Sequence, residues 1–166
     1  CMSTYEWHEF FAANGVTDHR EKFLETFNRW IRKSKLNVLK GLEAFPYVSQ
    51  TNGTSEAFSM FMQRHSNKTF KFYKGDFMMH KVASNNIGCK WEWIYNYGQI
   101  KEGDAVIVSC PFSDTGAVRS DMHELLNWCT HNNVPVLIDM AYFGMCYGIN
   151  INLDSPCVEE VTFSLG

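Results

Sequence analysis

The sequence predicts an α/β fold with a mainly parallel sheet and flanking helices. Short apolar runs rich in Val and Ile alternate with segments whose apolar residues recur every three or four positions. The runs at 105–109 and 134–138 are almost entirely apolar, as in strands that helices cover on both faces. Such alternation indicates parallel strands joined by crossover helices. Right-handed crossovers then place the loops after the strands at one sheet edge, where open α/β folds bind ligands.

Residues 1–44 are predicted to form an N-terminal helical segment, and residues 45–166 the α/β core. A helix to about Lys40 is indicated by apolar residues at offsets of three and four: Phe23, Phe27, Trp30 and Ile31. Asp18 is a candidate N-cap, because its carboxylate can accept a hydrogen bond from an unpaired backbone N–H group of the first turn. Gly41 is expected just after the C-terminus of this helix.

The core is predicted to alternate between strands and helices. Residues 45–50 are expected to form a short strand, which Pro46 confines to a sheet edge or to its own first residues. Residues 77–97 look less regular. The other expected elements are a helix beginning near residue 57, strands at 69–73, 105–109 and 134–139, a helix at 119–132, and the start of a further strand at 161–164.

Composition narrows the function classes. The net charge of −3 offers no basic face to nucleic acid. No apolar run approaches the roughly 20 residues that a membrane span needs, and no signal peptide is visible, so we expect a cytoplasmic protein. The cysteines show no CxxC pair and no zinc-binding spacing, so we expect no metal site and mostly buried thiols in a reducing compartment: Cys1, Cys89, Cys110, Cys129, Cys146 and Cys157.

The loop Asn52-Gly53-Thr54-Ser55 lies between a predicted strand and a predicted helix. Small residues let the backbone approach an anion closely, and a helix N-terminus offers unpaired N–H groups with a partial positive charge. The two hydroxyl groups add donors. Many strand-to-helix turns are rich in Gly, Ser and Thr, so this loop alone is weak evidence for a phosphate site.

Asp139 follows the apolar strand at 134–138 and precedes Met140, Ala141 and Tyr142. A buried acid is costly unless something pairs with it. A protonated pyridine nitrogen would be one such partner, and Tyr142 could place its hydroxyl beside the phenolic oxygen of the same ring. An Asp that caps the next turn, with Tyr142 in the core, is an equally good interpretation of these residues alone.

Two further turns fall on the predicted ligand edge. Phe77 could stack on a planar ligand, and His80 could support the site from behind. Ser113 and Asp114, which follow the strand at 105–109, could reach a ligand. The alternative for each residue is structural, because aromatics are common in this chain and because Ser and Asp favour turns.

In this order, the motifs resemble those of class I/II aminotransferases of fold type I, which depend on pyridoxal phosphate. That family has a Gly-Thr phosphate loop, a stacking aromatic with a His shortly after it, an Asn-Pro-Thr-Gly turn, Asp-x-Ala-Tyr, and a strand ending in a Ser-x-x-Lys type sequence. The resemblance covers about residues 45–166. The matching pieces are Gly53-Thr54, Phe77 with His80, Ser113-Asp114-Thr115-Gly116, Asp139-Met140-Ala141-Tyr142 and Thr162-Phe163-Ser164-Leu165-Gly166.

The resemblance implies the large domain of a transferase that moves an amino group between an amino acid and a 2-oxo acid. It implies that Asp139 binds the ring nitrogen, that Phe77 stacks on the ring, and that Tyr142 contacts the phenolic oxygen. It also implies a homodimer. The full set of implied cofactor-binding residues is Gly53, Thr54 and Ser55 at the phosphate, Phe77, Ser113, Asp139, Tyr142, and Ser164 near the phosphate.

Two departures from the family pattern bear on activity. Ser113 stands where the family has Asn, which leaves the reaction type open. No lysine follows Gly166 in this sequence, although the family forms its Schiff base on a lysine expected immediately after that position. The family's smaller C-terminal domain is also absent from the sequence.

Two alternatives to an aminotransferase remain. One is a non-catalytic relative that keeps the fold and binds phosphate ligands. The other is an unrelated α/β nucleotide-binding module, which is disfavoured because the chain lacks both the Gly-x-Gly-x-x-Gly fingerprint and the Walker lysine loop.

Overall fold

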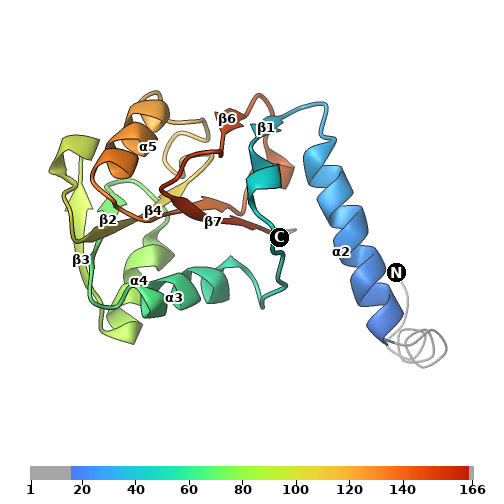
Figure 1. Ribbon diagram of the computed structural model, residues 1–166, viewed down its shortest axis with the longest axis horizontal. Helices are drawn as coiled ribbons and strands as arrows, with labels where there is room; N and C mark the ends of the chain where they lie inside the picture. Colours follow the sequence, from blue (N-terminus) through green and yellow to red (C-terminus); the bar gives the residue numbers. More distant parts are fainter. Residues whose placement is uncertain (1–15, 165–166) are drawn as a thin grey trace. The chain divides into compact units, whose positions relative to one another are not determined.

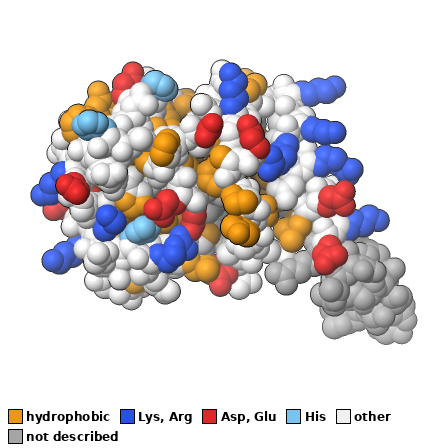
Figure 2. Space-filling view, in the orientation of Figure 1, with side chains coloured by type: hydrophobic (Ala, Val, Ile, Leu, Met, Phe, Trp, Pro, Cys, Tyr) orange, Lys and Arg blue, Asp and Glu red, His pale blue; other side chains and the backbone are white. Residues whose placement is uncertain are grey.

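The computed structural model describes residues 16–164, and the chain divides into two compact units, residues 1–35 and residues 36–166. The first unit contains helix α2 (Val16–Arg32), along which Phe27 stacks on both Phe23 and Trp30. Figure 2 shows Lys and Arg side chains along this helix. None of the helices that the structure describes is long and apolar enough to cross a bilayer.

The sequence correctly predicts a helix in the N-terminal segment, but both predicted ends are wrong. It already includes Val16, so Asp18 is not its N-cap, and it ends at Arg32 rather than near Lys40. The chain cannot continue as a helix because residues 38–40 form strand β1 (Val38–Lys40), which pairs with β6 (Asn150–Asn152). The second unit therefore begins at Leu36, before the start at residue 45 that the sequence predicts for the core.

Gly41 is a turn residue rather than the end of a helix. It has a φ of +83° and precedes the short 3-10 helix η1 (Leu42–Ala44). A side chain at this position would meet the backbone nitrogen of Asp154 at 2.3 Å, so only glycine fits the close approach of the two segments.

The main sheet has five parallel strands in the order β3-β2-β4-β5-β7, which confirms the predicted fold class (Figure 1). Helices α3 and α4 cover one face, and α5 lies on the other. The bounds of these elements are α3 Thr54–Arg64, β2 Thr69–Tyr73, α4 Met78–Ile87, β3 Lys90–Ile94, β4 Asp104–Ser109, α5 Met122–His131, β5 Val136–Met140 and β7 Val158–Phe163; two further 3-10 helices are η2 Tyr97–Gln99 and η3 Phe143–Met145.

Two stretches differ from the prediction. Residues 45–50 form no strand, and Tyr47 is 90% exposed. Pro46 has no N–H group to donate to a ladder, and β1 takes the place beside β6. Residues 77–97, predicted to be irregular, contain α4, β3 and η2.

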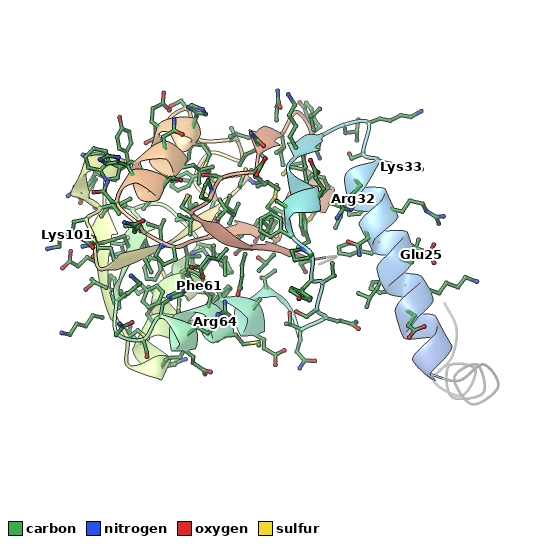
Figure 3. The ribbon with its side chains drawn as sticks, viewed as in Figure 1. Glu25, Arg32, Lys33, Phe61, Arg64 and Lys101 are labelled. Atoms are coloured by element: carbon green, nitrogen blue, oxygen red, sulfur yellow. The ribbon has the colours of Figure 1, made fainter. Side chains whose placement is uncertain are left out.

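The core lies between the sheet and the helices α3 and α4. Every residue of β4 and β5 is buried, as the apolar runs predict. On β2, Phe70 and Phe72 point toward α3 and α4, and they pack with Phe58 and Phe61. Arg64 lies over the Phe61 ring and forms an ion pair with Glu160, which fastens α3 to β7 (Figure 3).

Candidate functional site

Asp139 lies near the carboxyl end of β5, in the middle of the sheet edge that the sequence predicts for ligand binding. The register aligns it with Ser109 of β4 and Thr162 of β7. Its Oδ1 accepts hydrogen bonds from the Ala141 N–H and the Thr162 hydroxyl, each at 3.1 Å. Its Oδ2 lies 3.1 Å from Nε2 of His80, and its side chain is 2% exposed. The carboxylate is thus fixed by three donors, one from α4, one from β7 and one from the turn directly after β5.

His80 is fully buried among aromatic rings. Phe58, Phe72 and Phe77 surround it with ring centroids 5.1, 5.9 and 5.5 Å away. Its Nδ1 atom has no hydrogen-bond partner. A protonated ring would bury an unpaired N–H at that atom, so the arrangement favours a neutral imidazole whose Nε2–H donates to Asp139.

Asp139 therefore has no permanent cation beside it among the described residues. Within residues 16–164, the ion pairs include no Lys or Arg at Asp139. A buried carboxylate in this state is stabilised by hydrogen bonds alone, and a positively charged ligand group would compensate it directly. The structural alternative for this motif is correct in one half only: Asp139 accepts the Ala141 N–H and so caps the turn, but Tyr142 is 44% exposed and does not lie in the core.

Asp76, which the sequence analysis did not single out, connects two of the predicted residues. Its Oδ1 accepts the Phe77 N–H at 2.7 Å and the Ser113 hydroxyl at 3.3 Å. Its Oδ2 accepts the Ser109 N–H at 3.0 Å. The turn Lys74-Gly75-Asp76 carries no motif by itself, so sequence alone gave no signal for this role.

The predicted phosphate loop leads directly into α3. Gly53 is the N-cap, with φ +80° and ψ 169°, a conformation that is essentially restricted to glycine. No atom lies within 4 Å of a side chain built there, so the space above the first turn is open. Thr54 is buried and Ser55 is exposed at the start of the helix. Glu56 in the first turn accepts the Asn52 N–H at 2.6 Å, which fixes the loop.

The structure brings most of the predicted residues to one edge. Ring contacts and hydrogen bonds join Phe77, His80 and Asp139, and Asp76 adds Ser113. Phe58, one turn after Thr54, connects α3 to the same group through His80.

The remaining predicted residues lie at the ends of strands on this edge. Tyr142 begins the turn after β5 and is 44% exposed. Ser164 follows the last residue of β7 and is half-buried. Leu165, Gly166 and the position expected for the lysine fall outside the described residues, as does Cys1.

Some buried hydrogen-bonding groups have no partner among the described residues. In the described part of the chain, three buried side-chain atoms lack a partner: the Tyr73 hydroxyl, His80 Nδ1 and the Ser109 hydroxyl. Tyr73 and Ser109 are the last residues of β2 and β4. These atoms do not form one cluster, because the Tyr73 ring packs with Arg119 and Phe112, whereas His80 lies among Phe58, Phe72 and Phe77.

The cysteines of the described residues are free thiols, and most are buried as predicted. Burial raises the pKa of Cys110, which follows β4, to about 12, with a smaller contribution from Cys146. The described residues contain no group of three or more His, Cys, Asp or Glu side chains suited to a metal ion. Neither the thiols nor a metal accounts for the arrangement around Asp139.

The comparison with protein families gives a match that spans more than half of the chain. A family model described as aminotransferase class I and II matches residues 65–163. No curated protein matches the chain.

Several solved structures share the fold. An L-threonine-O-3-phosphate decarboxylase from Porphyromonas gingivalis is 16% identical, with a TM-score of 0.52, and the match covers 68% of this chain. An alanine aminotransferase from Pyrococcus furiosus is 18% identical, with a TM-score of 0.50 and 60% of this chain covered. A PLP-bound candidate aminotransferase from Clostridium difficile 630 is 16% identical, with a TM-score of 0.50 and 55% covered.

The chain spans only a part of each of these structures. It covers 37% of the decarboxylase, 30% of the alanine aminotransferase and 29% of the Clostridium difficile protein.

Proposed function

The chain belongs to the aminotransferase class I and II family, and we propose that it forms the pyridoxal-phosphate-binding core of an aminotransferase acting on an amino acid and a 2-oxo acid. The observation that carries this proposal is Asp139. Its carboxylate is buried at the ligand edge of the sheet, is oriented by His80, and has no Lys or Arg beside it in residues 16–164. A protonated pyridine nitrogen has the charge and the donor that this site lacks.

The chemistry of the residues present suits the cofactor. Asp139 would hold the ring nitrogen, and Phe77, half-buried beside His80, would face the ring. The open N-terminus of α3 at Gly53, with Thr54 and Ser55, would hold the phosphate. The hydroxyl groups of Tyr142 and Ser113 would lie on the side of the phenolic oxygen, and Ser164 near the phosphate. Ser109 and His80 retain unpaired polar atoms at the same edge.

The chain's own residues then act mainly by holding protons and orienting groups. Bound pyridoxal phosphate supplies an electron sink for an amino acid substrate. Asp139 keeps a proton on the ring nitrogen because its charge favours the protonated form of that nitrogen. His80 donates to Asp139 from a water-free aromatic environment, where a hydrogen bond to a charge is strong. The lysine that would move the substrate proton belongs to the part of the family pattern after Gly166.

The test is cofactor binding followed by amino-group transfer. Purified protein incubated with pyridoxal phosphate and then desalted should retain visible absorption, and incubation with an amino acid should convert the cofactor to its amino form. A protein that stays colourless contradicts the cofactor site. A coloured protein that exchanges no amino group with any amino acid supports a non-catalytic relative instead.

The family also supports a homodimer. Because the family builds its active site at a subunit interface, the purified protein should sediment as a dimer when loaded with pyridoxal phosphate. A protein that binds the cofactor fully as a monomer contradicts this part of the proposal.

A further inference from the structure

Asp76 is a buried carboxylate that touches three segments of the ligand edge. It is 7% exposed and lies in the turn between β2 and α4. It accepts hydrogen bonds from the backbone of Phe77, from the backbone of Ser109 at the end of β4, and from the Ser113 side chain. These donors lie on two different loops, so one carboxylate joins them.

The same two loops also meet through Gly75. This residue has a φ of +92°, and a side chain built on it would lie 3.1 Å from Cβ of Asp114. The turn at 74–77 and the turn at 112–116 are therefore packed closely together where Gly75 faces Asp114. Neither loop can move far while Asp76 keeps its hydrogen bonds.

Asp76 has no ion-pair partner among the described residues. A buried acid held only by donors is expensive to desolvate, and here the donors fix the backbone of Phe77 and the hydroxyl of Ser113. Both are residues that the proposed function places against the ring.

We propose that Asp76 is a positioning residue that locks the Phe77 loop to the Ser113 loop and so fixes the two side chains that would contact the cofactor ring. This inference rests on the proposed function. Asp76 would not touch the cofactor itself; it acts through Phe77, which would face the ring, and through Ser113, whose hydroxyl would lie beside the phenolic oxygen. It also engages the Ser113 hydroxyl hydrogen, so a ligand oxygen must compete with Asp76 for that donor.

The lock is tested first without any ligand, by amide hydrogen exchange. In Asp76→Ala, exchange at Phe77 and Ser109 should accelerate by on the order of ten- to a hundredfold relative to Val106, whose N–H bonds to Pro135. In Asp76→Asn, only one of the two amides should accelerate, because a carboxamide keeps a single acceptor oxygen. Ser113→Ala should leave both amides unchanged.

The positioning role is tested with pyridoxal phosphate. Asp76→Ala should bind pyridoxal phosphate about tenfold more weakly and with a smaller circular dichroism in the visible band, because Phe77 and Ser113 are no longer held in fixed positions against the ring. Gly88→Ala, which strains a turn at the other end of α4, should lower stability but leave both signals unchanged.

Two results would overturn the inference: wild-type exchange at both amides in Asp76→Ala, or wild-type affinity and dichroism in that variant. If the wild-type protein binds no pyridoxal phosphate, the proposed function fails, while the exchange experiment still decides whether Asp76 locks the two loops.

Discussion

Two buried aspartates at opposite edges of the same sheet show how this fold treats charge. Asp104 opens β4 at the amino edge, where Lys71 lies 3.7 Å away and the Lys101 N–H donates to it at 2.9 Å. Asp139 lies near the end of β5 at the carboxyl edge, where only a neutral His, a hydroxyl and a backbone N–H contact it. Both side chains are 2% exposed.

The different surroundings of Asp104 and Asp139 indicate a structural role for the first and a ligand-binding role for the second. At the amino edge, Asp104 has a buried cation nearby, which it shares with Glu92. The carboxyl edge leaves a negative charge and several polar atoms unmatched, which is a stability cost that a bound ligand can offset. A buried charged residue does not by itself identify a binding site. A buried charge that has no opposite charge beside it does.

The comparison predicts its largest effect at the amino edge. Lys71→Met removes the cation and leaves Asp104 buried and unpaired, which should lower the free energy of unfolding by about 3–5 kcal/mol. Glu92→Gln is the matched control, because Glu92 contacts the same lysine but is 64% exposed, so this variant should lose much less stability than Lys71→Met. Chemical denaturation measures both. Equal small losses would mean that Asp104 is not compensated by Lys71.

Asp139→Asn should show the opposite behaviour. The amide oxygen still accepts from Thr162 and Ala141, but its NH₂ group faces His80, whose proton must move from Nε2 to the unpartnered Nδ1, so the ligand-free protein should lose about 1–2 kcal/mol. Pyridoxal phosphate affinity should fall by about 1.5–3 kcal/mol, or roughly ten- to 150-fold, because a charged hydrogen bond is lost. Absorbance titration reads the affinity. A large loss of stability with unchanged affinity would place Asp139 with Asp104.

The ionisation of the Cys110 thiol tests whether water is excluded from the carboxyl edge of the sheet. An ordinary thiol has a pKa near 8.5, and burial raises the pKa of Cys110 to about 12. The folded state thus favours the neutral thiol, so its stabilising contribution is complete below about pH 8.5 and is lost as pH rises toward 12. Between pH 7 and 10, Cys110→Ala should lose about 2 kcal/mol less stability than wild type. Equal losses would indicate that water reaches this thiol.

Gly53 gives a smaller effect that separates backbone strain from ligand binding. Gly53→Ala meets no atom but must adopt a conformation that costs of order 1–3 kcal/mol. Gly88→Ala also needs a positive φ in open space and should cost about 1–2 kcal/mol. Only Gly53→Ala should weaken pyridoxal phosphate binding. If both variants bind equally well, the α3 N-terminus does not hold the phosphate.

Strands could be predicted from the sequence where a run of residues is almost entirely apolar. The apolar runs of β4 and β5 could only be buried strands, and Asp139 at the end of one of them stood out for that reason. The order Gly53, Phe77, Ser113 and Asp139 along the sequence predicts that these residues lie on one edge of a parallel sheet.

Contacts between distant segments were not predictable. Pairing of β1 with β6 ends the first helix early, and no local pattern reports a partner more than 100 residues away. Asp76 was missed because a turn Asp is ordinary in sequence, and its bonds to Ser109 and Ser113 exist only after β2 and β4 pair. Met78–Ile87 has no clean apolar stripe, since its buried residues are His80 and Ser84.

The protonation of the ring nitrogen tests the central claim most directly. Pyridoxal phosphate labelled with ¹⁵N in the ring can be bound to the wild-type protein and to Asp139→Asn and followed by NMR as pH is raised. We predict that the nitrogen stays protonated to distinctly higher pH in the wild-type protein than in the variant, because the Asp139 carboxylate stabilises the pyridinium. The same titration in both proteins would contradict the assignment of Asp139 and, with it, the account of this edge as a cofactor site.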